Sequence, residues 1–353
     1  MLQMKKNICQ WGWLIVFIVV SKVWAGPTYV TNTNITANTT WTASGSPYVV
    51  QNTIFISKGA VLTIDPGVQV RFATTNSGQA SGETTPNTDL SIEGGLRAIG
   101  TATDPISFYP LTPGQLWGAI YFSNSDPANS ILQDCIVKGG KIVCNASSPV
   151  IQDCDIFGAQ SGIEVAYNAD PQVINNRIAA NDTGILLLSD TSEIMATHNQ
   201  IYGNNYGIYI EGIFSQYAIN QNEIYSNLKY NVVNTSPVSI DISNNDFKLS
   251  NASKIAATIY DQSVNPKVGP INFEPYIGVG TGQNSSMVVS TKSAKNNPKQ
   301  EPHLSYQQEL WNYGKPFNAM EIGKMENGKK SSTTVKILAI GATAVLTVGF
   351  LFL

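Results

Sequence analysis

The sequence repeats one short phrase at a fixed interval, and this constrains its fold more than any other feature. An Asn followed two positions later by Ile or Phe recurs at even spacing, at Asn176, Asn199, Asn222 and Asn245. Two further markers, a Gly-Ile pair and a second Asn, keep nearly the same interval, at Gly162, Gly184 and Gly207 and at Asn181, Asn204 and Asn227. A period of roughly 20 to 50 residues is the signature of a repeat architecture. Three markers in one phase therefore predict a solenoid.

The sequence of each repeat is typical of short β-strands joined by turns. Apolar residues alternate over short runs such as 207–210, and Asn and Gly bound these runs. Such alternation indicates β-strands. A repeat of this length holds three short strands and three bends, which make one coil of a parallel β-helix, with equivalent strands about 4.8 Å apart. An Asn stacked on its copies can both donate and accept along the stack, so we expect structural Asn ladders, with Cys135 and Cys154 at the same position in earlier coils.

Composition limits the classes of partner. The chain has 353 residues, of which 42% are hydrophobic and only 13% charged, and its net charge is −3. The hydrophobic share supports a sizeable core. No basic field is present, so nucleic acid is not an expected partner.

The two ends of the chain predict export and anchoring. Lys5 and Lys6 precede an apolar run and the triplet Val23-Trp24-Ala25, which is typical of a signal peptide, residues 1–25. Residues 335–353 contain an uncharged run from Ile337 to Leu353, whose length is near the lower limit for a transmembrane helix. By the positive-inside rule, the lysines before this run would place the preceding segment in the cytoplasm, against the signal peptide. A tail that is removed and replaced by a lipid anchor is the alternative. We expect a protein of the cell surface or envelope.

Between these ends we expect a folded domain at residues 26–275 and a flexible stalk at 276–334, where Ser, Asn, Lys and Pro are frequent. The folded domain contains Cys135, Cys144 and Cys154, an odd number that leaves their disulfide state open. The sequence does not indicate an oligomeric state.

The less regular N-terminal coils carry a family resemblance. Residues 40–72, TWTASGSPYVVQNTIFISKGAVLTIDPGVQVRF, the Asn-x-Ile coils and the closing segment IAATIYDQSVNPKVGPINFEPYI resemble the secreted right-handed parallel β-helix proteins of bacteria and archaea, which have a pectin-lyase-like fold. The resemblance implies an all-β, single-stranded right-handed parallel β-helix of about nine coils over roughly residues 40 to 275. It leaves function open, because the same coils serve lyases, glycosidases, adhesins and surface-layer proteins.

Residues beside the ladder positions form one predicted outward stripe, in which three kinds of site compete. Asp134, Asp153 and Asp155 would cluster on adjacent coils, and three carboxylates at that spacing could hold Ca²⁺. This resembles the calcium clusters of pectate lyases in general position only. The alternative role of Arg177 is a surface ion pair with Asp155.

The second candidate is a pair of acids. Glu223 and Asp246 would be neighbours on adjacent coils, at a distance that suits the carboxyl pair of a retaining glycosidase, about 5 Å. Any two acids stacked in this fold would meet that distance. Two solvated surface acids are the competing interpretation.

The third candidate is an aromatic surface. Tyr202 and Tyr225, with Tyr209 nearby in the sequence, would offer a platform for sugar rings beside Gln200 and Arg177. Stacked aromatics also stabilise a sheet without any ligand, which is the competing interpretation.

We therefore expect a non-catalytic, membrane-tethered surface protein that binds polysaccharide or another surface partner through this stripe. The alternatives are a polysaccharide lyase or glycosidase, and a structural spacer. The regular coils between residues 154 and 248 leave little room for the long loops that would bound a catalytic cleft. No cofactor is expected apart from Ca²⁺ at the three aspartates.

Overall fold

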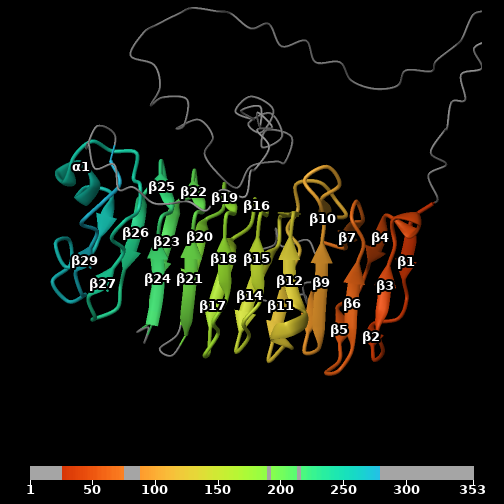
Figure 1. The fold of residues 1–353 in the computed structure, drawn as a ribbon. Helices are drawn as coiled ribbons and strands as arrows, with labels where there is room; N and C mark the ends of the chain where they lie inside the picture. Colours follow the sequence, from red (N-terminus) through yellow and green to blue (C-terminus); the bar gives the residue numbers. More distant parts are fainter. Residues whose placement is uncertain (1–25, 75–87, 189–191, 213–215, 279–353) are drawn as a thin grey trace, which may run out of the picture. The chain divides into compact units, whose positions relative to one another are not determined.

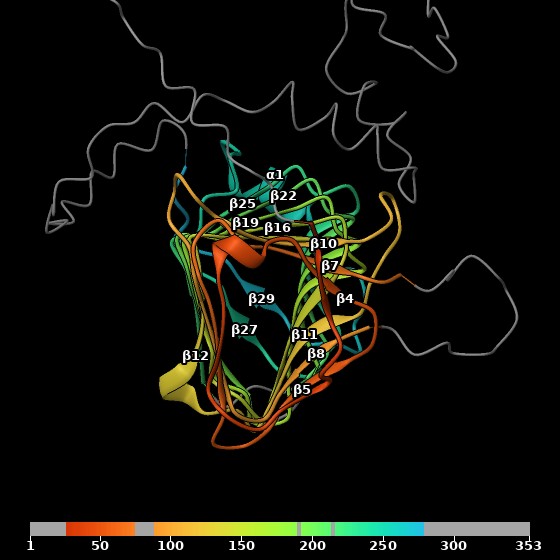
Figure 2. The same ribbon diagram turned by 90° about the vertical axis from the view of Figure 1, so that its right-hand side faces the viewer.

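The computed structural model describes residues 26–74, 88–188, 192–212 and 216–278, and these wind into a parallel β-solenoid of about nine turns (Figure 1). Three long sheets, here called A, B and C, surround a common core. Figure 2 looks along the solenoid, with strands of sheet C on the left, of sheet B on the right and of sheet A above. The predicted all-β solenoid is confirmed.

The strands of each sheet come from successive coils and pair in parallel. Sheet A contains β1 (Thr28–Val30), β4 (Tyr48–Val50), β7 (Gln69–Phe72), β10 (Ile106–Pro110), β13 (Cys135–Lys138), β16 (Asp155–Phe157), β19 (Arg177–Ala179), β22 (Gln200–Tyr202) and β25 (Glu223–Tyr225). Sheet B contains β2 (Asn34–Ile35), β5 (Ile54–Ile56), β8 (Leu90–Ile92), β11 (Ala119–Ser123), β14 (Lys141–Asn145), β17 (Ser161–Ala166), β20 (Thr183–Leu187), β23 (Tyr206–Ile210), β26 (Tyr230–Asn234) and β28 (Ile259–Tyr260). Sheet C contains β3 (Thr39–Trp41), β6 (Val61–Ile64), β9 (Gly95–Ile99), β12 (Ser130–Gln133), β15 (Val150–Gln152), β18 (Gln172–Ile174), β21 (Glu193–Thr197) and β24 (Gln216–Asn220).

The core is built from equivalent residues stacked coil upon coil. In sheet A, Ile156, Ile178, Ile201 and Ile224 are register partners in consecutive strands, and none exposes any of its surface. Their neighbours in the sequence point outward because side chains alternate along a strand. The repeat period therefore determines which residues reach the solvent.

Two ladders of Asn side chains run along the solenoid, as the repeat predicts, and all their members except the partly exposed Asn227 are buried. In the first, the Nδ2 of Asn199 donates to the Oδ1 of Asn222 over 2.9 Å, and the Nδ2 of Asn222 donates to the Oδ1 of Asn245 over 3.0 Å. The second ladder joins Asn181, Asn204 and Asn227 by bonds of 3.1 and 3.0 Å. The amides also donate to backbone carbonyls of neighbouring coils. These bonds satisfy polar groups that would otherwise be costly to bury.

The bend before the first ladder has a left-handed backbone in every regular coil. The residue preceding each ladder position has a φ between 48° and 61°, and these residues are Asp134, Asp153, Asn175, His198, Gln221 and Asn244. Asn, Asp and His tolerate this conformation better than most residues, because their short polar side chains can bond locally. The polar character of these positions thus follows from the bend itself.

All three cysteines of the described chain are buried free thiols, so none of the three forms a disulfide in this structure. The Sγ of Cys154 donates to the carbonyl of Gln152 over 3.1 Å, and that of Cys135 to the carbonyl of Gln133 over 3.3 Å. Burial raises the pKa of Cys144.

The C-terminal end is closed by the strand pair β27 (Ile240–Asp241) and β29 (Ile271–Asn272) and the short helix α1 (Ala252–Ala256). Asp261 ties this end together, since its carboxylate accepts from the backbone N–H of Ser263 and of Ile271, both at 2.9 Å. Burial opposes the charge on Asp261, but these bonds and one from the Ser263 hydroxyl outweigh it, so its pKa is lowered.

Several predicted segments lie outside the described residues. They are the signal peptide (1–25), the transmembrane anchor (335–353) and all but the first residues of the stalk (276–334). Within the described ranges no helix has the length and apolarity needed to cross a bilayer.

Candidate functional site

The predicted outward stripe is the outer face of sheet A. One column of this face runs through consecutive strands as register partners: Asp155, Arg177, Gln200, Glu223 and Asp246. The column two residues further on contains Phe157, Ala179, Tyr202 and Tyr225. The structure therefore brings together, from successive coils, most of the side chains that the sequence nominated.

Tyr202 and Tyr225 form a face-to-face stack. Their ring centroids are 5.2 Å apart and their planes differ by 10°. Neighbouring strands are about 4.8 Å apart, which is too close for two rings to lie side by side in one plane. The pair is therefore a ridge of two stacked, partly exposed rings, rather than the flat platform expected from the sequence. Burial is the main cause that raises the pKa of both phenols, so they remain hydrogen-bond donors at neutral pH.

Arg177 pairs with Asp155 across one coil, as predicted. The Nη2 of Arg177 lies 2.6 Å from the Oδ2 of Asp155, and the two side chains keep 25% and 37% of their surface exposed. An exposed pair of this kind contributes about 0 to 1 kcal/mol to stability. Its value to a site would lie in fixing the orientation of the Arg177 guanidinium.

Glu223 and Asp246 are neighbours on adjacent coils, but a lysine joins them. The Nζ of Lys248 lies 2.7 Å from the Oε1 of Glu223 and 2.7 Å from the Oδ2 of Asp246. Burial opposes the charge of Lys248, yet its hydrogen bonds to Asp246 and Glu223 outweigh this effect and raise its pKa. The Nε2 of Gln200 donates to the other oxygen of Glu223 over 3.2 Å. The carboxylates thus belong to a bonded network, and the ammonium takes the place that a glycosidic oxygen would need between them.

The three aspartates proposed for Ca²⁺ are not assembled as a ligand set. Asp134 and Asp153 occupy the left-handed bends, and Asp153 accepts from the Nδ2 of Asn175. Asp155 faces Arg177 on the strand. Among the residues that the structure describes, no group of three or more His, Cys, Asp and Glu side chains is placed to hold a metal ion.

Tyr209 does not join the stack of Tyr202 and Tyr225. It lies on β23 of sheet B, because the bend after Tyr202 carries the chain from sheet A to sheet B. There its ring makes an edge-to-face contact with Tyr206, with centroids 5.4 Å apart and planes at 88°.

Comparison with known proteins supports the fold. Residues 117–224 match the family model described as the right-handed beta helix region, and these residues span β11 to β25. These residues thus match a right-handed β-helix region, within a parallel β-solenoid of about nine turns. Comparisons with curated proteins and with solved structures gave no match, so they assign no ligand or reaction to it.

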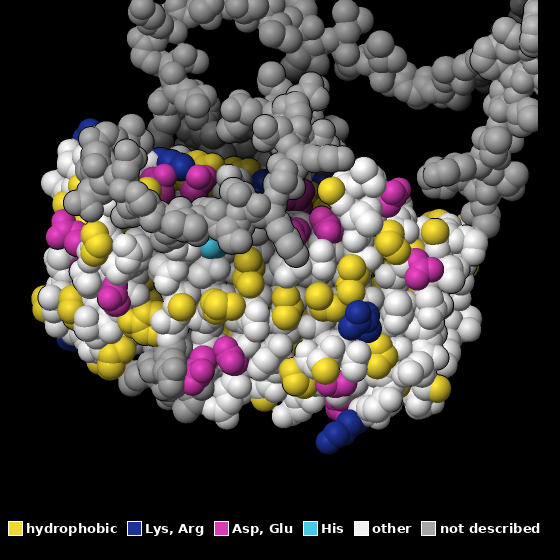
Figure 3. Space-filling view, in the orientation of Figure 1, with side chains coloured by type: hydrophobic (Ala, Val, Ile, Leu, Met, Phe, Trp, Pro, Cys, Tyr) yellow, Lys and Arg dark blue, Asp and Glu magenta, His cyan; other side chains and the backbone are white. Residues whose placement is uncertain are grey.

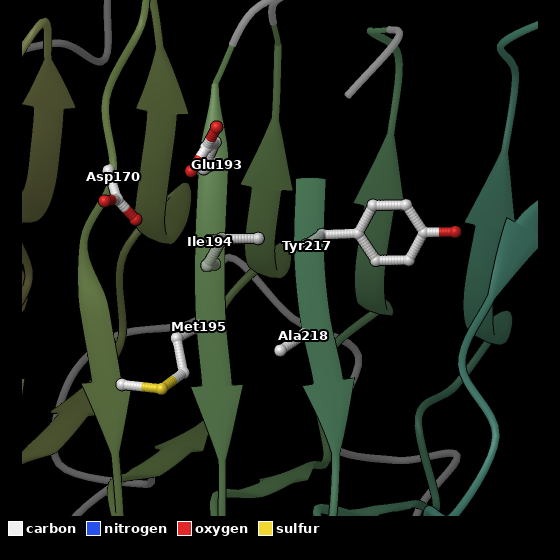
Figure 4. A pocket seen from close by; sticks show the side chains of 6 residues that line it. All are labelled: Asp170, Glu193, Ile194, Met195, Tyr217 and Ala218. Carbon is white, nitrogen blue, oxygen red and sulfur yellow. The ribbon is translucent and has the colours of Figure 1, made fainter. Parts of the chain in front are cut away.

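A shallow hollow of about 220 Å³ on sheet C of the β-helix was not predicted. Asp170, Glu193, Met195 and Ala218 line it, together with Tyr217. Figure 4 shows the Tyr217 ring extending sideways from its strand, and its hydroxyl accepts from the backbone N–H of Asp241 over 2.6 Å. Tyr217 thereby bridges the gap between β24 and β27. The signal in the sequence was that Tyr217 occupies the register position that Ile194 has in the preceding coil.

The same face of the molecule shows hydrophobic side chains in a line along the β-helix (Figure 3). On the outer side of sheet C, successive strands place Ile131, Val150, Gln172 and Met195 at equivalent positions, so that only Gln172 interrupts the apolar residues. Each of the three is only partly exposed. Apolar pairs on adjacent strands stabilise a sheet by their mutual contact, and this accounts for such a line without a ligand.

Proposed function

We propose that this β-helix binds polysaccharide through the outer face of sheet A, without catalysis, as a protein displayed on the cell surface or envelope. The observation that carries the proposal is the Tyr202–Tyr225 stack, flanked along one edge by a continuous column of hydrogen-bonding side chains. Export and anchoring rest on the predicted signal peptide and C-terminal apolar run.

A sugar polymer suits this arrangement chemically. Its hydroxyls need donors and acceptors, which Gln200, Glu223 and the Arg177–Asp155 pair offer on neighbouring strands. Its C–H groups carry a slight positive charge and pack against the electron-rich faces of the tyrosines, while the tyrosine hydroxyls can bond to its oxygens. Because equivalent residues repeat about every 4.8 Å along the β-helix, an extended chain lying along the axis can contact several coils at once.

The bonding of Glu223 and Asp246 favours binding over hydrolysis. A retaining glycosidase needs one carboxyl group to protonate the leaving oxygen and the other to attack the sugar. Here each carboxylate is bound by the Lys248 ammonium at 2.7 Å. The polysaccharide lyase or glycosidase remains the alternative, and its products are the readout that separates it from binding.

The test is a glycan-array and depolymerisation screen of the purified protein, with and without Ca²⁺. The Tyr202→Ala, Tyr225→Ala double variant is compared with Tyr29→Ala, which removes an exposed tyrosine from β1 at the other end of sheet A. Binding without cleavage that the double variant loses and Tyr29→Ala keeps would support the proposal. Release of reducing or unsaturated sugar ends would replace it with the enzyme, and binding unaffected by the double variant would remove the site from sheet A.

A further inference from the structure

Four tyrosines gather on the outer face of sheet B, near the C-terminal end of the β-helix. Tyr206 and Tyr209 lie on β23, Tyr230 on β26 and Tyr260 on β28. Tyr206 is the register partner of Tyr230, while Tyr209 and Tyr260 flank Val233 from the strands on either side. All four rings are partly exposed. They therefore form one surface cluster on three adjacent strands, on a different sheet from the Tyr202–Tyr225 stack.

The rings of this cluster meet edge to face. The planes of Tyr206 and Tyr209 differ by 88°, and those of Tyr230 and Tyr260 by 68° at a centroid distance of 5.5 Å. In such contacts the edge of one ring covers only one face of the other. A stack of parallel rings, in contrast, covers the inner face of both members.

A cation from the chain itself already lies against one ring of the cluster. The Nζ of Lys229 lies 4.8 Å from the centroid of the Tyr206 ring and donates a hydrogen bond to the Tyr206 hydroxyl over 3.3 Å. An ammonium group within about 6 Å of a ring centroid is attracted by the aromatic quadrupole. The cluster thus has one tyrosine in contact with an ammonium group, through its ring and its hydroxyl.

A carboxylate stands beside the other rings. Glu211 follows Tyr209 by two positions, so both side chains point to the outer face of the sheet. Its side chain is exposed and makes no hydrogen bond or ion pair with the described residues. Burial first and the Glu211 charge second raise the pKa of Tyr209, and Tyr206 and Tyr260 add to this effect, so Glu211 acts electrostatically on the Tyr209 phenol.

We propose that Tyr209, Tyr260 and Glu211 form a binding site for an organic ammonium group. The ring faces attract the cation, and the Glu211 carboxylate supplies the opposite charge. Two sources share this chemistry: the amine of an amino-sugar polymer and the quaternary ammonium of a choline-like head group. The site is independent of the polysaccharide site on sheet A, so either can exist without the other.

The experiment titrates the full-length protein with choline and with 3,3-dimethyl-1-butanol, its neutral isostere, and follows binding by NMR and calorimetry. A hexamer of glucosamine and its N-acetylated form provide the second matched pair, which separates the two sources. We expect the charged member of a pair to bind about 2- to 30-fold more tightly than the neutral one, the range of a cation–π contact expressed as an affinity ratio.

Variants locate the site. Tyr209→Leu and Glu211→Gln are each expected to weaken binding of the charged probe several-fold, whereas Tyr209→Phe keeps the ring and should stay close to wild type. Lys229→Met removes the internal competitor and should strengthen binding. Tyr29→Ala, at an exposed tyrosine outside both proposed sites, should leave it unchanged, with thermal unfolding as the check on folding of every variant.

Three results would overturn the proposal: no binding of either charged probe at millimolar concentration, equal binding of charged and neutral partners, or a Tyr209→Phe variant as weak as Tyr209→Leu. If a polysaccharide still binds through sheet A in the same preparation, the proposed polysaccharide site stands even though the ammonium site is refuted.

Discussion

Replacement of Asn199 by Ala tests whether the ladders hold the β-helix together. Asn199 lies in the middle of the first ladder and exposes none of its surface. Its Oδ1 accepts from the backbone N–H of Asn176 at 2.9 Å and from the Nδ2 of the same residue at 3.0 Å. Its own Nδ2 donates to the carbonyls of Val173 and Thr197 at 2.8 and 3.1 Å.

The magnitude follows from the groups left behind. The Asn199→Ala change leaves two buried donors of Asn176 without their acceptor and removes a donor from two carbonyls and from the Oδ1 of Asn222. A buried donor without an acceptor costs about 1 to 3 kcal/mol, and carbonyls that keep a second partner cost less, so we expect a loss of about 3 to 5 kcal/mol. Asn199→Cys should cost less than Ala, because the Cys154 thiol bonds to a carbonyl at the equivalent position.

The assay is equilibrium urea unfolding followed by circular dichroism, with midpoint and slope compared between variants. Both are needed, because a solenoid can unfold from one end and a changed slope reveals this. Asn52→Ala, at an exposed Asn outside any strand, is the control and should change stability by less than about 0.5 kcal/mol. An Asn199→Ala variant within about 1 kcal/mol of that control would refute the reasoning.

Three further predictions concern the bends, the C-terminal closure and the lysine bridge. Gly184→Ala should destabilise by about 2 to 4 kcal/mol in the same assay, because the added Cβ would lie 2.5 Å from the carbonyl oxygen of Gly207. Gly203→Asn should be tolerated, since φ is +64° there and no heavy atom lies within 4 Å of the added Cβ. The folded-state pKa of Asp261 is lowered, so its stabilisation is present above the unfolded value of about 3.9 and is lost as the pH falls below it. Thermal unfolding of wild type and Asp261→Asn should therefore differ at pH 7, and the difference should shrink as the pH falls through the folded-state pKa of Asp261. Lys248→Met should lower stability by no more than about 1 kcal/mol, because the bridge is 38% exposed at the lysine, and high salt should shrink the difference; a loss that salt does not change would contradict a surface ion pair.

The period of the repeat was enough to predict the solenoid, the inward column and the ladders. Once Asn176 and Asn199 are aligned, alternation along the strand places Ile178 and Ile201 inside and Arg177 and Gln200 outside, as the register confirms. These features depend on backbone geometry that every coil shares. They could therefore be derived from spacing alone.

The details of the candidate site depended on information that spacing does not contain. Tyr209 was grouped with Tyr202, but the bend between them assigns the two residues to different sheets. Lys248 has a left-handed backbone, with φ of 54°, and its long side chain bridges Glu223 and Asp246. The direction of a long side chain is decided by its partners rather than by the repeat. The same holds for the two tyrosine groups, whose ring planes depend on which rings contact each other.

The first ladder also has a direction. From Asn176 to Asn222, each Nδ2 donates to the Oδ1 of the next Asn toward the C-terminus, so the amide dipoles all point the same way along the axis. At the last rung the Nδ2 of Asn245 donates instead to the carbonyls of Ile219 and Ile242. A polar chain of this kind can be lengthened between any two rungs, provided that the addition is one whole coil. The length of the molecule is thus a variable that duplication or deletion of a complete repeat can change in single steps, whereas a shift of one residue would exchange the inward and outward positions and separate each amide from its partner.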